Sequence, residues 1–137
     1  MTKPDKSADR FKHRTRLEKI GAKPEWRTAV VAVGDREFVA ELRRAVAEVA
    51  IGRVPDERDA IFFGVVDAKE LARLPILKQS LKQNGALWVI RPKGRPEISE
   101  RAVMDAGLAA GLVDVKVISF SPTHTGEKFV IPVVNRR

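Results

Sequence analysis

Three basic side chains follow a short apolar run in the segment LWVIRPKGRP, and they are the first candidates for a binding site. Arg91, Lys93 and Arg95 are separated by proline and glycine, which predicts an ordered loop. Guanidinium and ammonium groups in such a loop can bind a carboxylate or a phosphate. Glu97 and Glu100 follow closely and could neutralise the same charges, so the sequence leaves a binding loop and a solvated turn as alternatives.

Two other turns end apolar runs in the same way. Gly34 and Asp35 follow the run 27–33, and Asp67 follows the run 60–66. Ligands of open parallel sheets collect beyond the carboxyl ends of the strands, so these three residues join the three basic ones as predicted ligand-binding residues. The first turn, VAVGDREF, has one glycine where a phosphate-binding turn has several. Asp35 also puts negative charge where a phosphate would lie, and the sequence therefore predicts no nucleotide cofactor.

The residue types that carry catalysis or hold metals are sparse. The chain has no cysteine, which excludes disulfides and thiolate chemistry. None of the serines lies in a GxSxG motif, and His124 in SPTHTG is the one candidate base for them. His13 and His124 lack the spacing of a metal site. The segment SPTHTG, residues 121–126, is predicted to form a plain hairpin loop. The sequence predicts no catalytic residue and no metal, which favours a protein without enzyme activity.

Positive charge is concentrated near the N-terminus. The net charge is +8, and residues 1–27 contain nine Lys or Arg against four Asp or Glu. Such a segment is attracted to phosphate backbones and acidic surfaces without reading sequence. Lys12, Arg14, Arg16 and Lys19 are the predicted nucleic-acid contacts. The alternative is a solubilising, partly disordered extension.

The same segment contains a helical pattern over residues 9–20. Asp9 can cap its start, and Gly21 suits the left-handed residue after its end. Leu17 and Ile20 are expected to rest on the body of the protein, with the four basic side chains in water. Residues 1–22 are therefore treated as a basic arm, and residues 23–137 as a single domain.

The body alternates between buried-strand and amphipathic-helix patterns. Asp35 and Asp67 are predicted to cap the first two helices, and Pro75 to split the second. This order predicts an α/β protein, a three-layer Rossmann-like sandwich with a mostly parallel sheet and an antiparallel C-terminal hairpin. The predicted strands are 27–33, a short edge strand at 51–54, 60–66, 86–90, 113–121 and 127–134; the predicted helices are 35–50, 67–84 and 99–110.

Two segments carry a resemblance to known proteins. The stretch IGAKPEW and the stretch GALWVIRPK resemble a domain-of-unknown-function family of short bacterial Rossmann-like proteins, with Glu25 where that family has glycine. The stretch 85–132 resembles the last third of class I methyltransferase-like Rossmann domains. The resemblance implies the strand order 2-1-3-4-6-5, with the sixth strand antiparallel and a switch point between the first and third strands. It implies no reaction, because the short bacterial family has no assigned chemistry. The chain also departs from the methyltransferase cofactor site, since the first turn has one glycine and Asp56 is the only acid near the end of the second strand.

Composition and length limit the function. A chain of 137 residues with 44% apolar residues can bury one ordinary core, and its apolar runs are far shorter than a membrane span. We expect a soluble, cytoplasmic, non-catalytic domain that binds a partner or a small ligand. One alternative is association with nucleic acid or an acidic protein surface through the basic arm. The other is an atypical adenosylmethionine binder or methyltransferase-like enzyme.

Overall fold

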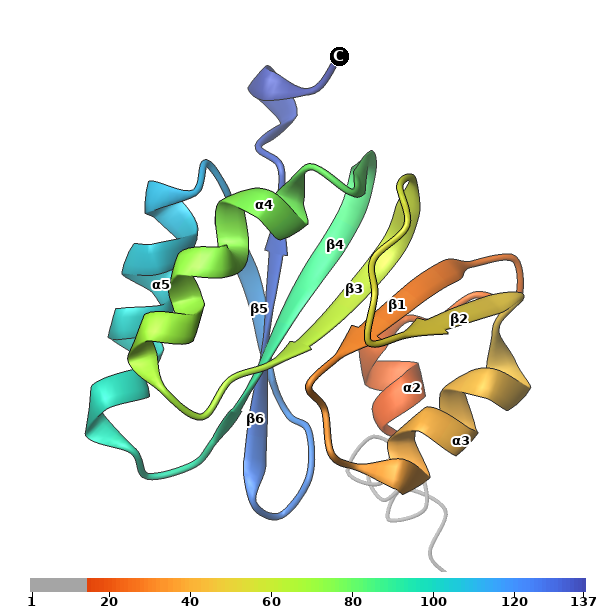
Figure 1. Ribbon diagram of the computed structural model, residues 1–137, viewed down its shortest axis with the longest axis horizontal. Coiled ribbons are helices and arrows are strands. Elements are labelled where there is room, and N and C mark those ends of the chain that lie inside the picture. The colour runs from red at the N-terminus through yellow and green to blue at the C-terminus, as the bar shows by residue number, and fades with distance from the viewer. Residues whose placement is uncertain (1–14) are drawn as a thin grey trace, which may run out of the picture.

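Six strands form a single sheet in the computed structural model, which describes residues 15–137 of the chain (Figure 1). Their order across the sheet is β2-β1-β3-β4-β6-β5, with β6 antiparallel to both of its neighbours. The other pairs are parallel. Because β2 and β3 lie on opposite sides of β1, the switch point of the sheet lies between β1 and β3. The predicted fold class and strand order are confirmed. The strands are β1 (Arg27–Val31), β2 (Glu48–Ile51), β3 (Arg58–Gly64), β4 (Leu81–Pro92), β5 (Val113–Ser119) and β6 (His124–Val130).

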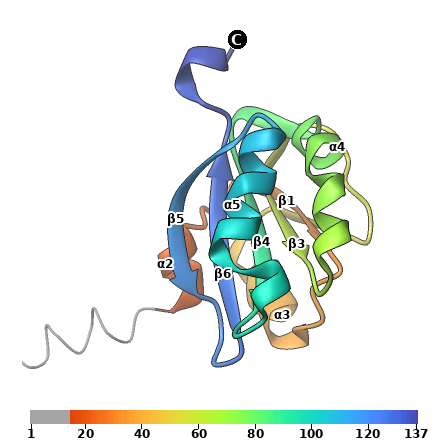
Figure 2. The ribbon, with the colours of Figure 1, turned by 90° about the vertical axis from the view of Figure 1, so that its left-hand side faces the viewer.

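Helices cover both faces of the sheet (Figures 1 and 2). One buried cluster joins the sheet to α2 and α3 through side chains such as Phe38 and Leu42. The other joins it to η1, α4 and α5 through side chains such as Leu74 and Val103. The helices are α2 (Arg16–Ile20), α3 (Arg36–Ala45), η1 (Ala68–Arg73), α4 (Leu74–Lys78), η2 (Pro96–Ile98), α5 (Glu100–Ala109) and η3 (Val133–Asn135), the η elements being 3₁₀ helices.

Local signals for helix ends are confirmed. Asp35 caps α3 by accepting a hydrogen bond from the Phe38 amide at 2.9 Å. Asp67 caps η1 in a capping box with Glu70, as the spacing predicts. Pro75 splits its segment into η1 and α4, because a proline is accommodated in the first turn of a helix and not in its interior. These features depend on neighbouring residues alone.

Two predicted helices are too long and correspond to strands at their ends. The helix predicted over 35–50 ends at Ala45. The edge strand, predicted at 51–54, is β2 at Glu48–Ile51. The helix predicted over 67–84 ends at Lys78, and β4 begins at Leu81 rather than at 86. In both cases pairing with a neighbouring strand overrides a weak helical preference. Because β4 extends to Pro92, Arg91 is a strand residue and not a loop residue.

The N-terminal helix is described only in its last part. The predicted cap Asp9 lies outside the described residues, whereas α2 begins at a capping box formed by Thr15 and Glu18. Gly21 follows its end in the left-handed conformation, with φ of 78°. Ile20 is buried and Leu17 packs against the same cluster, so the predicted contact of this helix with the body is confirmed.

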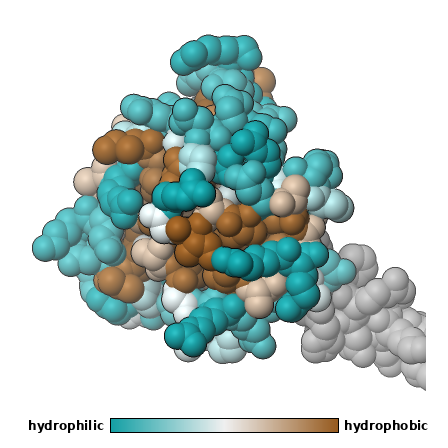
Figure 3. Space-filling model, turned by 45° about the vertical axis from the view of Figure 1, so that its right-hand side comes forward, coloured by the Kyte–Doolittle hydropathy of each residue, from teal (hydrophilic) through white to brown (hydrophobic). Residues whose placement is uncertain are grey.

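Glycine allows β3 and β1 to approach closely where both strands end. A Cβ atom at Gly64 would collide with the backbone carbonyl of Ala32, which itself has φ of 60°. The view in Figure 3 shows hydrophobic side chains gathered near the middle of one face, with hydrophilic ones around them. Among residues 15–137, the helices are all too short or too polar to cross a membrane.

Candidate ligand site at the carboxyl ends of the strands

A cavity of 580 Å³ lies where β1, β3 and β4 end, beside the start of β6. We call it the strand-end cavity. This is the switch point of the sheet, where ligands of open α/β proteins bind, and the volume falls in the range of small-molecule sites. Its lining is mostly apolar or backbone, and it consists of Ala32, Val33, Gly34, Asp35, Gly64, Val65, Val66, Ile90, Phe120, Ser121, Thr123 and His124.

The predicted residues of the first turn, Gly34 and Asp35, are part of this lining. Asp35 lies at the N-terminus of α3, where its carboxylate already accepts the hydrogen bond that a bound anion would otherwise receive. A phosphate is therefore disfavoured at this helix end on two grounds, the charge of Asp35 and the occupied amide. The turn suits an uncharged group instead.

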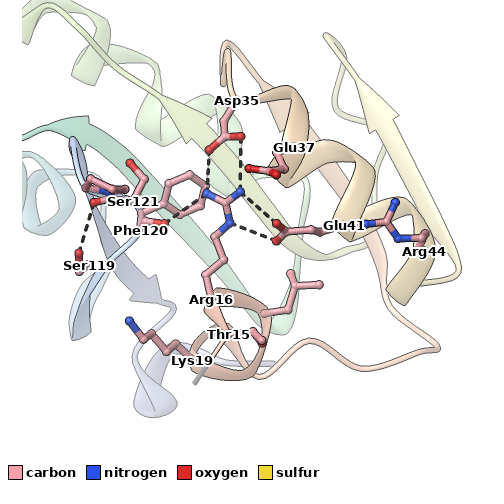
Figure 4. A pocket seen from close by; sticks show the side chains of 12 residues that line it. Thr15, Arg16, Lys19, Asp35, Glu37, Glu41, Arg44, Ser119, Phe120 and Ser121 are labelled. Atoms are coloured by element: carbon pink, nitrogen blue, oxygen red, sulfur yellow. Dashed lines mark hydrogen bonds and ion pairs between the residues drawn. The ribbon is translucent and has the colours of Figure 1, made fainter. Parts of the chain in front are cut away.

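Arg16 closes one side of the turn (Figure 4). Its guanidinium lies 2.7 Å from Asp35 Oδ2 and 3.1 Å from Glu41 Oε1, and it also donates to the carbonyl of Phe120. The same group lies over the rings of Phe38 and Phe120, at 5.3 Å and 4.8 Å from their centres. Arg16 was predicted to remain in water; that prediction is wrong, because two carboxylates and two rings hold a side chain that is 13% exposed.

Asp35 of this ion-pair cluster lines two hollows. A more open hollow of 930 Å³, lined by α2 and α3, shares Asp35, Phe120 and Ser121 with the strand-end cavity. Burial opposes ionisation of Asp35 and is the largest single effect on it. The hydrogen bonds from Arg16 and from backbone amides, together with the charge of Arg16, outweigh burial, so the pKa of Asp35 is lowered. Asp35 is thus a carboxylate that is already neutralised, not one that awaits a ligand cation.

The hairpin side of the cavity supplies hydroxyl groups and an imidazole. Ser121 Oγ accepts hydrogen bonds from the amides of Thr123 and His124, which holds the turn. Thr123 Oγ1 lies 2.8 Å from His124 Nδ1. A nucleophile would need a base that a third group orients, and among residues 15–137 the imidazole has this one hydrogen bond. These groups can orient a polar ligand, and they form no catalytic arrangement.

Arg91 points away from the cavity, into the opposite core. Its Nε donates to Glu127 Oε1 at 2.6 Å, and the two side chains are 9% and 0% exposed. Burial raises the pKa of Glu127, and the ion pair with Arg91 offsets only part of that effect. Glu127 Oε2 has no hydrogen-bond partner among the described residues. The pair connects β4 to β6 and leaves Arg91 without access to a ligand in the strand-end cavity.

The other three predicted ligand residues lie outside the cavity lining as well. Asp67 serves as the helix cap, and Lys93 donates to Ser119 Oγ at 2.9 Å. Arg95 binds Glu97 and the carbonyl of Val66, which is itself a cavity residue. The basic loop therefore has local partners. Of the six predicted ligand-binding residues, the structure brings Gly34 and Asp35 together at the cavity.

The predicted nucleic-acid residues are divided between regions. Lys12 and Arg14 lie outside the described residues, and Arg16 is held by acidic partners. Lys19 lies at a separate hollow near the amino ends of the strands. The sequence analysis did not single out Glu41 or Phe120, since their contacts with Arg16 span 25 and 104 residues of chain. Glu41 lies six positions after the Asp35 cap, a spacing that does not place two side chains on one helix face, so the sequence held no signal for it.

Solved structures with the same fold are methyltransferases and related proteins. A SAM-dependent methyltransferase from Aquifex aeolicus is 19% identical, with a TM-score of 0.66 over 85% of this chain and 87% of that one. Ribosomal protein L11 methylase from Lactobacillus delbrueckii subsp. bulgaricus is 13% identical, with a TM-score of 0.63 over 84% and 74%. The fibrillarin pre-rRNA processing protein of Methanococcus jannaschii is 12% identical, with a TM-score of 0.55 over 80% and 67%.

These identities are low enough that the likeness shows the fold alone. No protein-family model matches the chain, and no curated protein matches its sequence. The resemblance to a short bacterial family therefore stays a prediction. The resemblance to class I methyltransferases is confirmed as a structural one: the chain has the Rossmann-like fold of SAM-dependent methyltransferases.

Proposed function

We propose that this protein binds a small adenosyl compound in the strand-end cavity and catalyses no methyl transfer. The observation that carries the proposal is a largely apolar cavity of 580 Å³ at the switch point, in which the one carboxylate is neutralised by Arg16. An adenosyl group is uncharged, offers a flat apolar ring and hydroxyls, and suits such a lining. Solved proteins of this fold include one described as SAM-dependent and one solved with SAH.

Two features support a binding role without catalysis. The first turn has one glycine, and its helix N-terminus is already capped, so the approach of a ligand to the backbone is limited on that side. In addition, the ionisable side chains of the cavity lining are Asp35 and His124. The first is held by Arg16, and the second has the Thr123 hydroxyl as its partner and no carboxylate within hydrogen-bond distance in the described chain. Neither is arranged to move a proton from a substrate.

Calorimetry with S-adenosylhomocysteine and S-adenosylmethionine tests the binding. Val66 lines the cavity and is 58% exposed, so Val66→Trp should obstruct the cavity without disturbing the core. Val134→Trp is the matched control, since Val134 is 90% exposed and is not part of the lining. We expect binding by the natural chain and the control, and loss with Val66→Trp. If neither ligand gives a heat of binding with the natural chain, the adenosyl proposal is rejected.

A methyl-transfer assay tests the second half. The chain is incubated with labelled S-adenosylmethionine and mixtures of RNA, protein and small-molecule acceptors. We expect no transfer of label above the level seen with Val66→Trp. Reproducible transfer by the natural chain, lost in that variant, would make the protein an enzyme and overturn the non-catalytic role.

Nucleic-acid association through the basic arm is the second function that the charge distribution predicts. It stays a prediction for Lys12 and Arg14, and Arg16 is an unsuitable contact because its charge is matched by Asp35 and Glu41. Lys19 remains as a described candidate. Lys19 lies at the C-terminal end of the arm, where it lines a hollow together with basic residues of the domain.

A further inference from the structure

A third hollow, of 490 Å³, lies at the opposite end of the sheet from the strand-end cavity. It is formed by the end of α2, the residues before β1, the start of β4 and the last part of β6, with β5 along one side. We call it the basic hollow, because five of its lining residues are cationic. They are Lys19, Lys23, Lys116, Lys128 and Arg136.

Two of these lysines face each other directly across neighbouring strands. Lys116 of β5 pairs in register with Lys128 of β6, so two like charges occupy opposite positions. Like charges in this arrangement destabilise a sheet. Burial lowers the pKa of Lys128, and the charge of Lys116 lowers it further. Both effects oppose a second positive charge at this place, yet the sequence puts one there.

The structure provides little compensation for these charges. Lys116 Nζ donates to the carbonyl of Lys19 at 2.6 Å, and Arg136 Nε to the carbonyl of Ile131 at 2.9 Å. These partners are dipoles and carry no counter-charge. Within residues 15–137, the side chains of Lys23 and Lys128 have no hydrogen-bond or ion-pair partner.

Acidic side chains of the lining have partners elsewhere. Asp59 lies 3.0 Å from Lys82 and accepts a hydrogen bond from the Arg27 amide. Glu18 completes the capping box of α2 by accepting from the Thr15 amide. The cations of the hollow thus exceed the carboxylates of its lining, five to two, and both carboxylates have other contacts.

We propose that the basic hollow binds phosphate groups, either free or in the backbone of a nucleic-acid strand. Convergent ammonium groups around a concave surface attract and hold a phosphate through Coulombic attraction and charge-assisted hydrogen bonds. Trp26 lines the same hollow and offers an aromatic surface beside it. The site is independent of the strand-end cavity, so failure of either proposal leaves the other intact.

Fluorescence anisotropy with a labelled mixed-sequence RNA of roughly ten nucleotides, over a salt series, tests the nucleic-acid source of the phosphate. Four full-length proteins are compared. They are the natural chain, the hollow variant Lys116→Met/Lys128→Met, the edge control Lys69→Met/Lys93→Met and the arm variant Lys12→Met/Arg14→Met. Each variant removes two positive charges, so a difference between them reports position and not net charge.

We expect the hollow variant to bind RNA about 10-fold more weakly at low salt, with a salt slope lower by roughly one to two. The edge control should stay within about twofold of the natural chain, since Lys69 and Lys93 lie outside the hollow. Loss confined to the arm variant would overturn the proposal. Equal losses in all three variants would also overturn it, because they would report net charge alone.

Thermal unfolding with pyrophosphate at constant ionic strength tests whether the hollow binds a free phosphate compound. We expect pyrophosphate to raise the melting temperature of the natural chain and of the edge control, and to leave that of the hollow variant unchanged. A shift without RNA binding would assign the hollow to a free phosphate compound. Neither a shift nor RNA binding by the natural chain would overturn the proposal. A melting temperature of the hollow variant at or above that of the natural chain shows that it is folded.

Discussion

The strand-end cavity and the basic hollow differ in whether their charged side chains have partners of opposite charge. At the carboxyl ends, Arg16 is matched by Asp35 and Glu41, and Arg95 by Glu97. At the amino ends, Lys116 and Lys128 face one another without a carboxylate. Neutralised charge around an apolar cavity suits an uncharged group such as adenosyl, whereas unmatched charge in a hollow suits an anion. We therefore propose a different class of ligand for each of the two.

The largest expected effect comes from breaking the buried pair of Arg91 and Glu127. Arg91→Met should lower the free energy of unfolding by about 3–5 kcal/mol, because Glu127 would keep a buried charge without its partner. Urea denaturation measures the loss. The double variant Arg91→Met/Glu127→Leu should recover most of it, and a double variant as unstable as the single one would contradict the compensation described for this region.

Next in size is the removal of Arg16. Arg16→Met should cost about 2 kcal/mol at neutral pH, since two carboxylates lose charge-assisted hydrogen bonds. The lowered pKa of Asp35 fixes the sign of the pH dependence. Stability from this contact is complete above the ordinary carboxyl pKa of about 4 and is lost as the pH falls through the lowered value. Thermal melts from pH 7 to pH 2 should show the two proteins converging in acid.

A difference between the proteins that stays constant down to pH 2 would show that Arg16 acts through its contacts with the rings of Phe38 and Phe120 alone. Arg16→Lys is the matched control. It keeps the charge but lacks the planar group that reaches both carboxylates, so we expect an intermediate stability.

The smallest expected effect has the opposite sign. Lys116→Met/Lys128→Met should raise the free energy of unfolding by roughly 0.5 kcal/mol at low salt, because it removes a repulsive cross-strand pair. Added salt screens that repulsion and should remove the gain. Denaturation at two salt concentrations measures it. Destabilisation at low salt would indicate that the two lysines are compensated, and it would end the contrast between the two ends of the sheet.

The sequence predicted the features that depend on near neighbours. The caps at Asp35 and Asp67 and the break at Pro75 follow from residues at most four positions apart. The order of apolar runs was enough to predict the fold class. The predicted bounds of β2 and β4 were wrong, because those residues adopt extended structure only when a neighbouring strand is present.

The contacts of the charged residues depend on how strands and helices are aligned in space, which the sequence alone does not reveal. Arg16 and Asp35 are 19 residues apart, and Arg91 and Glu127 are 36 apart. Each residue alone has the appearance of a solvent-exposed charge. The pairing of Lys116 with Lys128 likewise follows from the exact offset of the C-terminal hairpin, and a shift of one residue would remove it. Arg91 and Arg95 were therefore predicted to contact a ligand, whereas in the structure they form ion pairs within the protein.

One measurement tests the division of the fold into two ligand classes most directly. Amide and indole resonances of the ¹⁵N-labelled full chain are followed by NMR during titration with S-adenosylhomocysteine and, separately, with pyrophosphate. We predict that the first ligand shifts Gly34, Val66 and Ser121, and that the second shifts Trp26, Lys116 and Lys128. Pyrophosphate shifts at the strand-end cavity, or one common set of shifts for both ligands, would contradict the account.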